Sequence, residues 1–203
     1  EQAFASAGHS AAMARVASYY LPAGVVREAL SGVGFYRFLK ELLAHFDERA
    51  GELAAKLADL AARLFTDGGC TLSFGGSEEA LDAYREASAP FGGTAAAPVL
   101  TVPAPEDKHE AFVVASDVTY TACGWDRRLL GEPYGGTWLL ASRILSYDFL
   151  WTEVRVKGGA YGAGFQTTRS GSSRFYSYRD PRIDETVERF RTAGDWLAGV
   201  FSP

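Results

Sequence analysis

The sequence contains very little sulfur and very little histidine, with two cysteines, one methionine and three histidines among 203 residues. Cys70 and Cys123 are too few and too far apart to form a disulfide framework. We therefore expect small buried thiols in a reducing compartment, and we predict a cytoplasmic location. The scarcity of both residue types also leaves few candidates for a zinc site, because histidine and cysteine are its usual ligands.

Blocks of like charge and long hydrophobic runs are absent as well. The net charge of −5 is spread along the chain, so we expect no basic face and no nucleic acid partner. No apolar run reaches the length of a membrane span, so we predict no membrane partner. The first four residues lack the basic and apolar regions of a signal peptide. The chain does not begin with methionine, and we expect it to be a segment of a longer protein.

The inverted zinc motif His-x-x-Glu-His is missing. That motif places two imidazoles one turn apart on a helix, with a carboxylate between them as general base. His45 is followed by Glu48 and then by Arg49, a cation at the position of the second zinc ligand. His9 and His109 complete no ligand pair either. The sequence therefore predicts no metal site within these residues.

Two other functional motifs are excluded because the predicted secondary structure around them is wrong for each motif. A dinucleotide-binding loop follows a strand and opens a helix, whereas the glycine-rich stretch 158–164 follows a predicted helix and opens a predicted strand. A serine hydrolase carries its nucleophile on a sharp strand-to-helix turn, whereas the Ser-Gly-Ser of residues 170–172 lies in a predicted hairpin turn. We expect neither nucleotide binding nor a serine triad.

Hydrophobic periodicity divides the chain into a helical segment and a mixed domain. The predicted elements are helices over 4–20 and 22–30, an apolar helical stripe over 35–65 that Gly51 bends or divides, a strand over 70–74, a helix over 77–87, a connector over 88–110, strands over 112–115 and 118–124, a largely buried helix over 133–157, a hairpin of 160–168 with 174–179, and a final helix that begins at Asp180-Pro181. This order predicts an α+β fold, a mainly antiparallel sheet with helices packed on one face. The predicted domains are a helical segment over 1–67, continuing from a missing upstream domain, and an α+β domain over 68–203.

The most informative stretch, residues 154–162, reads VRVKGGAYG and lies at the end of the long predicted helix. Gly158 and Gly159 stop the helix, and Gly162 follows the tyrosine. Together these glycines leave the surroundings of Tyr161 bare of side chains, so that another polypeptide can approach the backbone closely.

Arg155 and Tyr161 admit two interpretations. In the functional one, the arginine offers a fork of donors and the tyrosine one hydroxyl donor, and the pair stabilises a developing tetrahedral oxyanion. In the structural one, Arg155 and Lys157 are cations that favour the last turn of a helix, and Tyr161 is a strand aromatic packed on the core.

This stretch resembles a signature of the presequence-protease branch of the insulinase/pitrilysin zinc metallopeptidases. The likeness is carried by Leu150-Trp151-x-x-Val154-Arg155-x-Lys157-Gly158-Gly159-Ala160-Tyr161-Gly162 and by a second similar run, Phe175-Tyr176-Ser177-Tyr178-Arg179-Asp180-Pro181. It is strong over residues 134–195 and looser upstream. The resemblance implies the C-terminal half of a clam-shaped peptidase, whose N-terminal half carries the zinc and the general base.

The resemblance further implies that Arg155 and Tyr161 contact the peptide near the scissile bond. It implies zinc in the full-length enzyme, bound outside these residues, and two partners: a peptide substrate and an N-terminal catalytic half, in the same chain or in a separate subunit. We thus predict the substrate-clasping C-terminal part of a zinc metalloendopeptidase that degrades unfolded peptides in a closed chamber, inactive on its own. The alternatives are a non-catalytic insulinase-like scaffold or partner subunit, and a small-molecule binder that uses the glycine loop.

Overall fold

The computed structural model describes residues 2–65, 71–89 and 101–202 of the chain. The chain divides into two compact units, Glu1–Arg37 with Val102–Pro203, and Phe38–Thr101. The first helices therefore belong to the same unit as the sheet. The predicted domain boundary between residues 67 and 68 stays a prediction.

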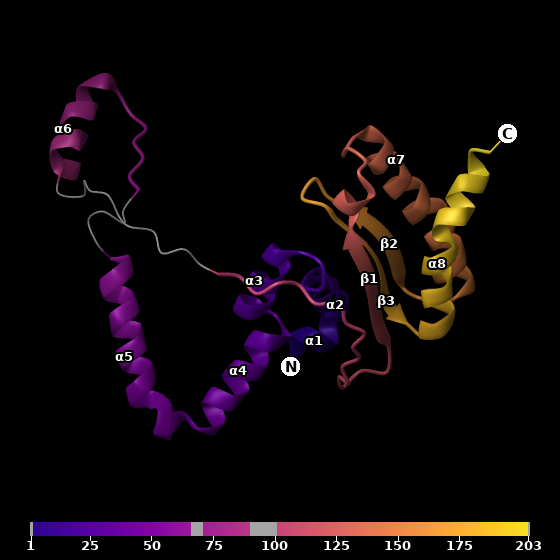
Figure 1. The fold of residues 1–203 in the computed structure, drawn as a ribbon, viewed down its shortest axis with the longest axis horizontal. Helices are drawn as coiled ribbons and strands as arrows, with labels where there is room; N and C mark the ends of the chain where they lie inside the picture. The colour runs from indigo at the N-terminus through magenta and orange to yellow at the C-terminus, as the bar shows by residue number, and fades with distance from the viewer. Residues whose placement is uncertain (1, 66–70, 90–100, 203) are drawn as a thin grey trace. The chain divides into compact units, whose positions relative to one another are not determined.

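The described elements confirm the predicted α+β class with a helical N-terminal segment (Figure 1). In chain order they are α1 (Gln2–Ser6), α2 (Gly8–Ala17), α3 (Pro22–Ser31), α4 (Val33–Ala44), α5 (Phe46–Leu64), α6 (Glu78–Ser88), β1 (Thr119–Asp126), the short 3-10 helix η3 (Arg127–Leu130), α7 (Gly136–Ile144), η4 (Leu145–Lys157), β2 (Gly162–Thr167), β3 (Ser172–Asp180) and α8 (Ile183–Val200). The helix η4 continues α7 but has the wider π-helical turn, with hydrogen bonds from i to i+5.

The sheet has three antiparallel strands in the order β1-β3-β2. The predicted hairpin is confirmed as β2 and β3, in which Phe165 lies opposite Phe175. Alternation along the central strand sends Phe175 to one face and Tyr176 and Tyr178 to the other, because successive side chains of a strand point to opposite sides. The sheet therefore offers an apolar face and a tyrosine-rich face.

The apolar face carries the core of this unit. The helices α7, η4 and α8 lie along this face of the sheet (Figure 1). The buried members of the core are Leu145, Phe149, Leu150, Val154, Ala160, Phe165, Phe175, Phe190 and Ala193. Val154 is fully buried one residue before Arg155, so the core fixes the backbone from which that arginine projects.

The tyrosine-rich face is covered by the N-terminal helices. The helix α2 packs against β1 and β3, and the ring of His9 lies 4.7 Å from the ring of Tyr178. The hydroxyl of Tyr120 donates a hydrogen bond of 2.6 Å to the carbonyl oxygen of Ala5. The sheet therefore packs on both faces, one against α7, η4 and α8 and the other against the first helices.

Two predicted strands are wrong. Residues 71–74 and 112–115 form no strand in the structure, and Cys70 lies outside the described residues. The segment near residue 112 instead holds its position through side chains: the guanidinium groups of Arg15 and Arg37 lie 5.8 and 5.4 Å from the ring centre of Phe112. A β-prone run becomes a strand only where a neighbouring edge supplies hydrogen bonds.

Four predicted helices also have boundaries that need correction, and the first, predicted over 4–20, is divided into α1 and α2 and ends at Ala17. The long stripe divides at His45, and α5 passes through Gly51 without a break. The last helix begins at Ile183, because the carboxylate of Asp180 accepts a hydrogen bond of 2.9 Å from the backbone N–H of Arg182 and forms a turn before the helix. The helix predicted over 133–157 begins at Gly136.

The prediction that the 133–157 helix is largely buried holds for only one side of it. Leu139, Tyr147 and Trp151 are exposed, whereas Phe149 and Val154 belong to the core.

In the other unit, the predicted N-cap at Ser77 is confirmed by a hydrogen bond of 3.4 Å from the N–H of Ala80 to the serine oxygen. Within the described ranges, no helix has the length and apolarity needed to cross a bilayer.

Candidate functional site

The helix η4 ends in a backbone conformation that requires glycine. A Cβ atom on Gly158 would lie 2.5 Å from the carbonyl oxygen of Val154, and Gly159 has a φ of +86°. Side chains at these two positions would meet the helix or strain the turn. A Cβ atom on Gly162 would lie 3.9 Å from the Cβ atom of Tyr178, an ordinary van der Waals contact, so this position does not itself require glycine. The chain therefore turns within two residues, which brings Tyr161 back beside the last turn of η4.

Arg155 lies against aromatic rings and has no carboxylate partner among the described residues. Its guanidinium carbon is 3.9 Å from the ring centre of Trp151 and 5.8 Å from that of Tyr161. An arginine stacked on an indole keeps its N–H groups at the edge of the plane, where they can donate to another molecule. The rings orient the guanidinium and leave its hydrogen-bonding capacity available.

Lys157, two residues further on, has the opposite environment. Its amino group forms an ion pair of 2.6 Å with the carboxylate of Glu153, which also lies 3.6 Å from Arg189 on α8. Glu153 is therefore already shared by two cations, and neither of them is Arg155. The helix-end interpretation fits Lys157, whose charge is neutralised locally, better than it fits Arg155.

Tyr161 stands at the surface, with 67% of its area exposed. The interpretation of this residue as a core aromatic is therefore wrong. Its backbone N–H lies 3.0 Å from the carbonyl oxygen of Tyr178 and 3.2 Å from that of Arg179. Its ring contacts Tyr178 edge-to-face, with 5.6 Å between ring centres. The backbone is thus fixed to β3, while no hydrogen bond holds the Tyr161 hydroxyl among the described residues.

The structure adds two residues that sequence reasoning did not assign to the site. Trp151 supports Arg155 from one turn earlier on η4, and a spacing of four between an aromatic residue and an arginine was the available signal. Tyr178 supports Tyr161 across the hairpin, and it is in turn packed against His9 from α2. No local pattern points to Tyr178, because its role depends on the register of the hairpin.

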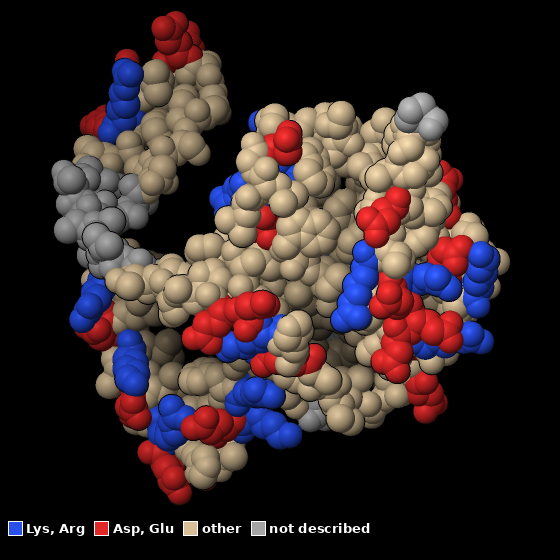
Figure 2. All heavy atoms as spheres, turned by 45° about the vertical axis from the view of Figure 1, so that its right-hand side comes forward, with Lys and Arg blue, Asp and Glu red and all other residues tan. Residues whose placement is uncertain are grey.

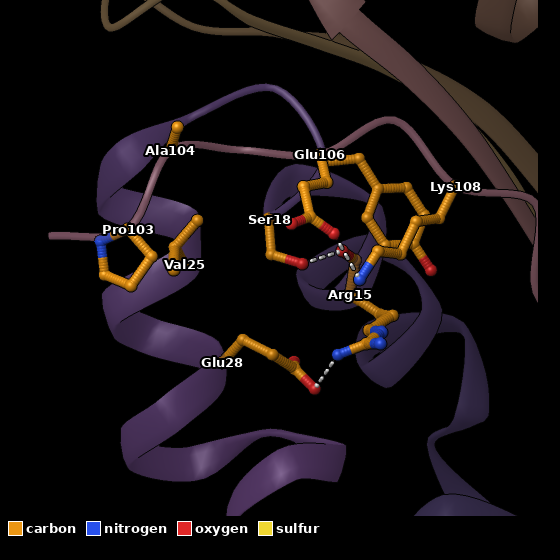
Figure 3. Close-up of a pocket in the computed structure, with 9 residues that line it drawn as sticks. Arg15, Ser18, Val25, Glu28, Pro103, Ala104, Glu106 and Lys108 are labelled. Carbon is orange, nitrogen blue, oxygen red and sulfur yellow. Dashed lines mark hydrogen bonds and ion pairs between the residues drawn. The ribbon is translucent and has the colours of Figure 1, made fainter.

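A second polar site lies in the same unit, between α2, α3 and the segment that leads to β1. It is a cavity of about 200 Å³, lined among others by Arg15, Tyr19 and Glu28 (Figure 3). Arg15 donates a hydrogen bond of 2.9 Å to the carboxylate of the buried Glu28. It donates two more, of 2.7 and 2.9 Å, to the carboxylate of Glu110. The hydroxyl of Tyr19 also donates to Glu110. All the charge of Arg15 is engaged by carboxylates.

The titration of this second site follows from its contacts. The hydrogen bonds from Arg15 and Tyr19 lower the pKa of Glu110 to about 2. Burial, followed by the hydrogen bond to Glu110, raises the pKa of Tyr19 to about 12. Elsewhere, burial raises the pKa of the Cys123 thiol to about 11, so this partly buried cysteine is protonated at neutral pH and unreactive.

Within the described ranges, no three His, Cys, Asp or Glu side chains form a group that could hold a metal ion. His45 pairs only with the exposed Glu48, at 3.5 Å, and His9 lies among tyrosines. The residues that the structure describes therefore do not fit a zinc ion. On the face shown in Figure 2, acidic and basic side chains lie interspersed rather than in a single basic stripe.

Two family models match the chain. The PreP C-terminal domain matches residues 109–200, and the model for the domain associated with subfamily C of the M16 peptidases matches residues 1–42. Similar proteins include protein HypA of Clostridium perfringens, 30% identical over 97% of this chain and 20% of that protein. The mitochondrial presequence protease of Yarrowia lipolytica is 29% identical over 96% of this chain and 20% of that protein, and presequence protease 1, chloroplastic/mitochondrial, of Arabidopsis thaliana is 27% identical over 98% and 19%. The chain thus spans about one fifth of the length of these relatives.

Proposed function

We infer a function from one premise, that the chain belongs to the presequence-protease branch of the M16 (insulinase) peptidase family and corresponds to a C-terminal part of those proteins. The proposal is that it acts as the substrate-clasping part of a zinc metalloendopeptidase that degrades unfolded peptides in a closed chamber. The observation that carries it is Arg155, an arginine oriented by aromatic rings with no carboxylate partner among the described residues, beside the exposed Tyr161.

Arg155 and Tyr161 have complementary roles in this proposal. The guanidinium of Arg155 donates to a carbonyl oxygen of the bound peptide and stabilises the negative charge that develops on it. The hydroxyl of Tyr161 provides a second donor to the same region. The turn at Gly158 and Gly159 keeps the two donors side by side. Neither residue needs to accept a proton for this task, because both act by hydrogen bonding.

Peptidases of the M16 family are generally zinc-dependent. We place the zinc and the general base in a catalytic half outside these residues, so the chain alone is inactive. When bound there, the metal supplies Lewis-acid activation of the scissile carbonyl or of water. Arg155 and Tyr161 would hold the peptide from the opposite side. A cytoplasmic location stays a prediction, since the presequence proteases named above are mitochondrial or chloroplastic.

The test compares Arg155→Ala and Tyr161→Phe with Lys157→Ala in the complete peptidase. Each of the first two variants should lower kcat by roughly tenfold or more, since a lost oxyanion donor is worth about 3 kcal/mol. Bound zinc, measured by elemental analysis, should be unchanged. Lys157→Ala is the matched control: it removes a neighbouring cation that is already paired with Glu153, and its kcat should stay within about twofold of the wild type.

Three results would contradict the proposal in different ways. If Arg155→Ala and Tyr161→Phe both cleave peptides at the wild-type rate, their assigned roles are wrong. If the complete protein binds no zinc and cleaves no peptide, the non-catalytic scaffold is the better description. Loss of activity together with loss of zinc would instead indicate that Arg155 supports the fold of the catalytic half.

A further inference from the structure

The helix that carries the half-buried Arg155 also carries a regular stripe of side chains, whose other members are exposed. Every fourth residue from α7 to the end of η4 belongs to it: Leu139, Arg143, Tyr147, Trp151 and Arg155. Contacts along the stripe repeat the same pairing. The guanidinium of Arg143 lies 5.7 Å from the ring centre of Tyr147, just as that of Arg155 lies over Trp151. The stripe therefore presents two arginines, each oriented by an aromatic neighbour.

The change from α7 to η4 keeps this stripe on one side of the helix. In an α-helix of 3.6 residues per turn, each fourth residue advances beyond a full turn, so a spacing of four drifts around the axis. In the wider π-helical turn each fourth residue falls short of a full turn, and the drift reverses. The first half of the stripe and the second half therefore stay aligned.

A groove of about 540 Å³ runs between this stripe and strand β2. Leu139, Arg143, Tyr147 and Trp151 line its helical wall, and Gly162 and Ala163 contribute to the opposite wall. Trp151 thus joins the groove to the Arg155 site. On the strand side, the residues at the start of β2 are small and leave room for the side chains of a bound chain.

The middle of the β2 edge is already occupied. The hydroxyl of Ser142 donates a hydrogen bond of 2.7 Å to the carbonyl oxygen of Phe165, and the N–H of Phe165 donates 3.0 Å to Ser146 Oγ. A peptide in the groove would therefore meet serine side chains at this point and not free backbone groups. We expect recognition here to depend on the side chains of the peptide rather than on strand addition.

The groove is lined by a positively charged side chain, Arg143, and by no negatively charged one. None of the residues that line it is Asp or Glu, and no ion pair involves Arg143 in the parts of the chain that the structure describes. An apolar or acidic side chain would be accepted, because Leu139 and Tyr147 offer apolar contact and Arg143 offers a charge-assisted hydrogen bond. A lysine or arginine would face an uncompensated like charge.

We propose that this groove is a specificity subsite for the extended substrate peptide, in which Arg143 selects an acidic residue some distance from the scissile bond. The inference rests on the proposed function of Arg155. Twelve residues separate the two arginines, a helical rise of at most about 18 Å at 1.5 Å per residue. An extended peptide covers this span in about five residues at 3.3 Å each. The selected position therefore lies at most about five residues from the bond that is cut.

The experiment uses the complete peptidase and quenched-fluorescence peptides with one cleavage site. A single Glu is moved through positions roughly three to seven residues from the scissile bond, on each side, with a Lys twin for every peptide. At one position near the fifth residue, on one side only, the Glu peptide should have a kcat/KM about tenfold above that of its Lys twin, the effect of one charge-assisted hydrogen bond. Arg143→Glu should abolish or reverse this preference.

Two controls make the result specific. Arg191→Glu changes another exposed arginine, on α8, and should keep the wild-type preference. For every variant the Glu peptide is compared with its own Lys twin, so that a general effect of Arg143→Glu on turnover cancels in the ratio of the two kcat/KM values. If Arg143→Glu keeps the Glu preference while Arg155→Ala still slows every peptide, the subsite is wrong and the proposed function stands. If Arg155→Ala has no effect on any peptide, the proposed function fails first.

Discussion

The two arginine sites of this unit have opposite surroundings. Arg15, in the cavity of Figure 3, is held by the carboxylates of Glu28 and Glu110. Arg155 lies 3.9 Å from the ring centre of Trp151 and 5.8 Å from that of Tyr161, and it has no carboxylate partner among the described residues. A guanidinium that carboxylates already satisfy stabilises the fold, whereas one oriented by rings keeps its donors available. The same residue type thus supports structure in one place and recognition in the other.

The largest effect that would separate the two sites is on stability. Arg15→Ala leaves the carboxylate of Glu28 buried without its cation, and we expect a loss of about 2 to 3 kcal/mol in the free energy of unfolding, slightly below the range for a fully buried pair. Urea denaturation of the chain measures it. Arg27→Ala, on the same helix as Glu28 but exposed, is the control and should change little. A loss below about 0.5 kcal/mol for Arg15→Ala would mean that water satisfies Glu28 and that the comparison is wrong.

A smaller effect is expected at the aromatic support of Arg155. Trp151→Ala removes the ring at 3.9 Å and leaves the guanidinium free to rotate. A lost cation–π contact of about 1 kcal/mol or more corresponds to a decrease of roughly five- to tenfold in kcat/KM of the complete peptidase. Trp151→Phe should restore part of this activity. Val156→Ala, an exposed neighbour outside the stripe, serves as the control, and an equal loss in that variant would show a general effect on η4.

The smallest effect is the pH dependence of the Arg15 cavity. Glu110 has a folded-state pKa of about 2 against an ordinary value of 4.5, so the folded state binds fewer protons in that interval. Its contribution to stability is present above about pH 4.5 and disappears as the pH falls toward 2. Stability curves of the wild type and Glu110→Gln should differ at pH 7 and converge near pH 2. A constant difference across that range would show that Glu110 does not titrate with folding.

The elements with strong local sequence patterns were predicted correctly, whereas elements that need a neighbouring segment of the chain were not. The hairpin of β2 and β3 and the helix α3 follow from alternation, glycine and proline. The runs at 71–74 and 112–115 have the composition of strands, yet neither pairs with a strand in the described part of the chain. Likewise, Gly51 marked a plausible break, but a glycine in an exposed helix costs only about 1 kcal/mol, which neighbouring turns of α5 can absorb.

The candidate site shows the same division. Arg155, Tyr161 and the glycine turn that brings them together could be predicted from residues 154–162 alone, because the conformation of a turn depends on local residues. Which of the two basic residues is available was decided by tertiary contacts: Glu153 pairs with Lys157 and lies near Arg189 of α8, and no carboxylate pairs with Arg155 in the described structure. The supports from Trp151 and Tyr178, and the groove beside β2, depend on helix width and strand register. Sequence alone determined the chemistry that is present, and packing decided which of these groups remain free to act.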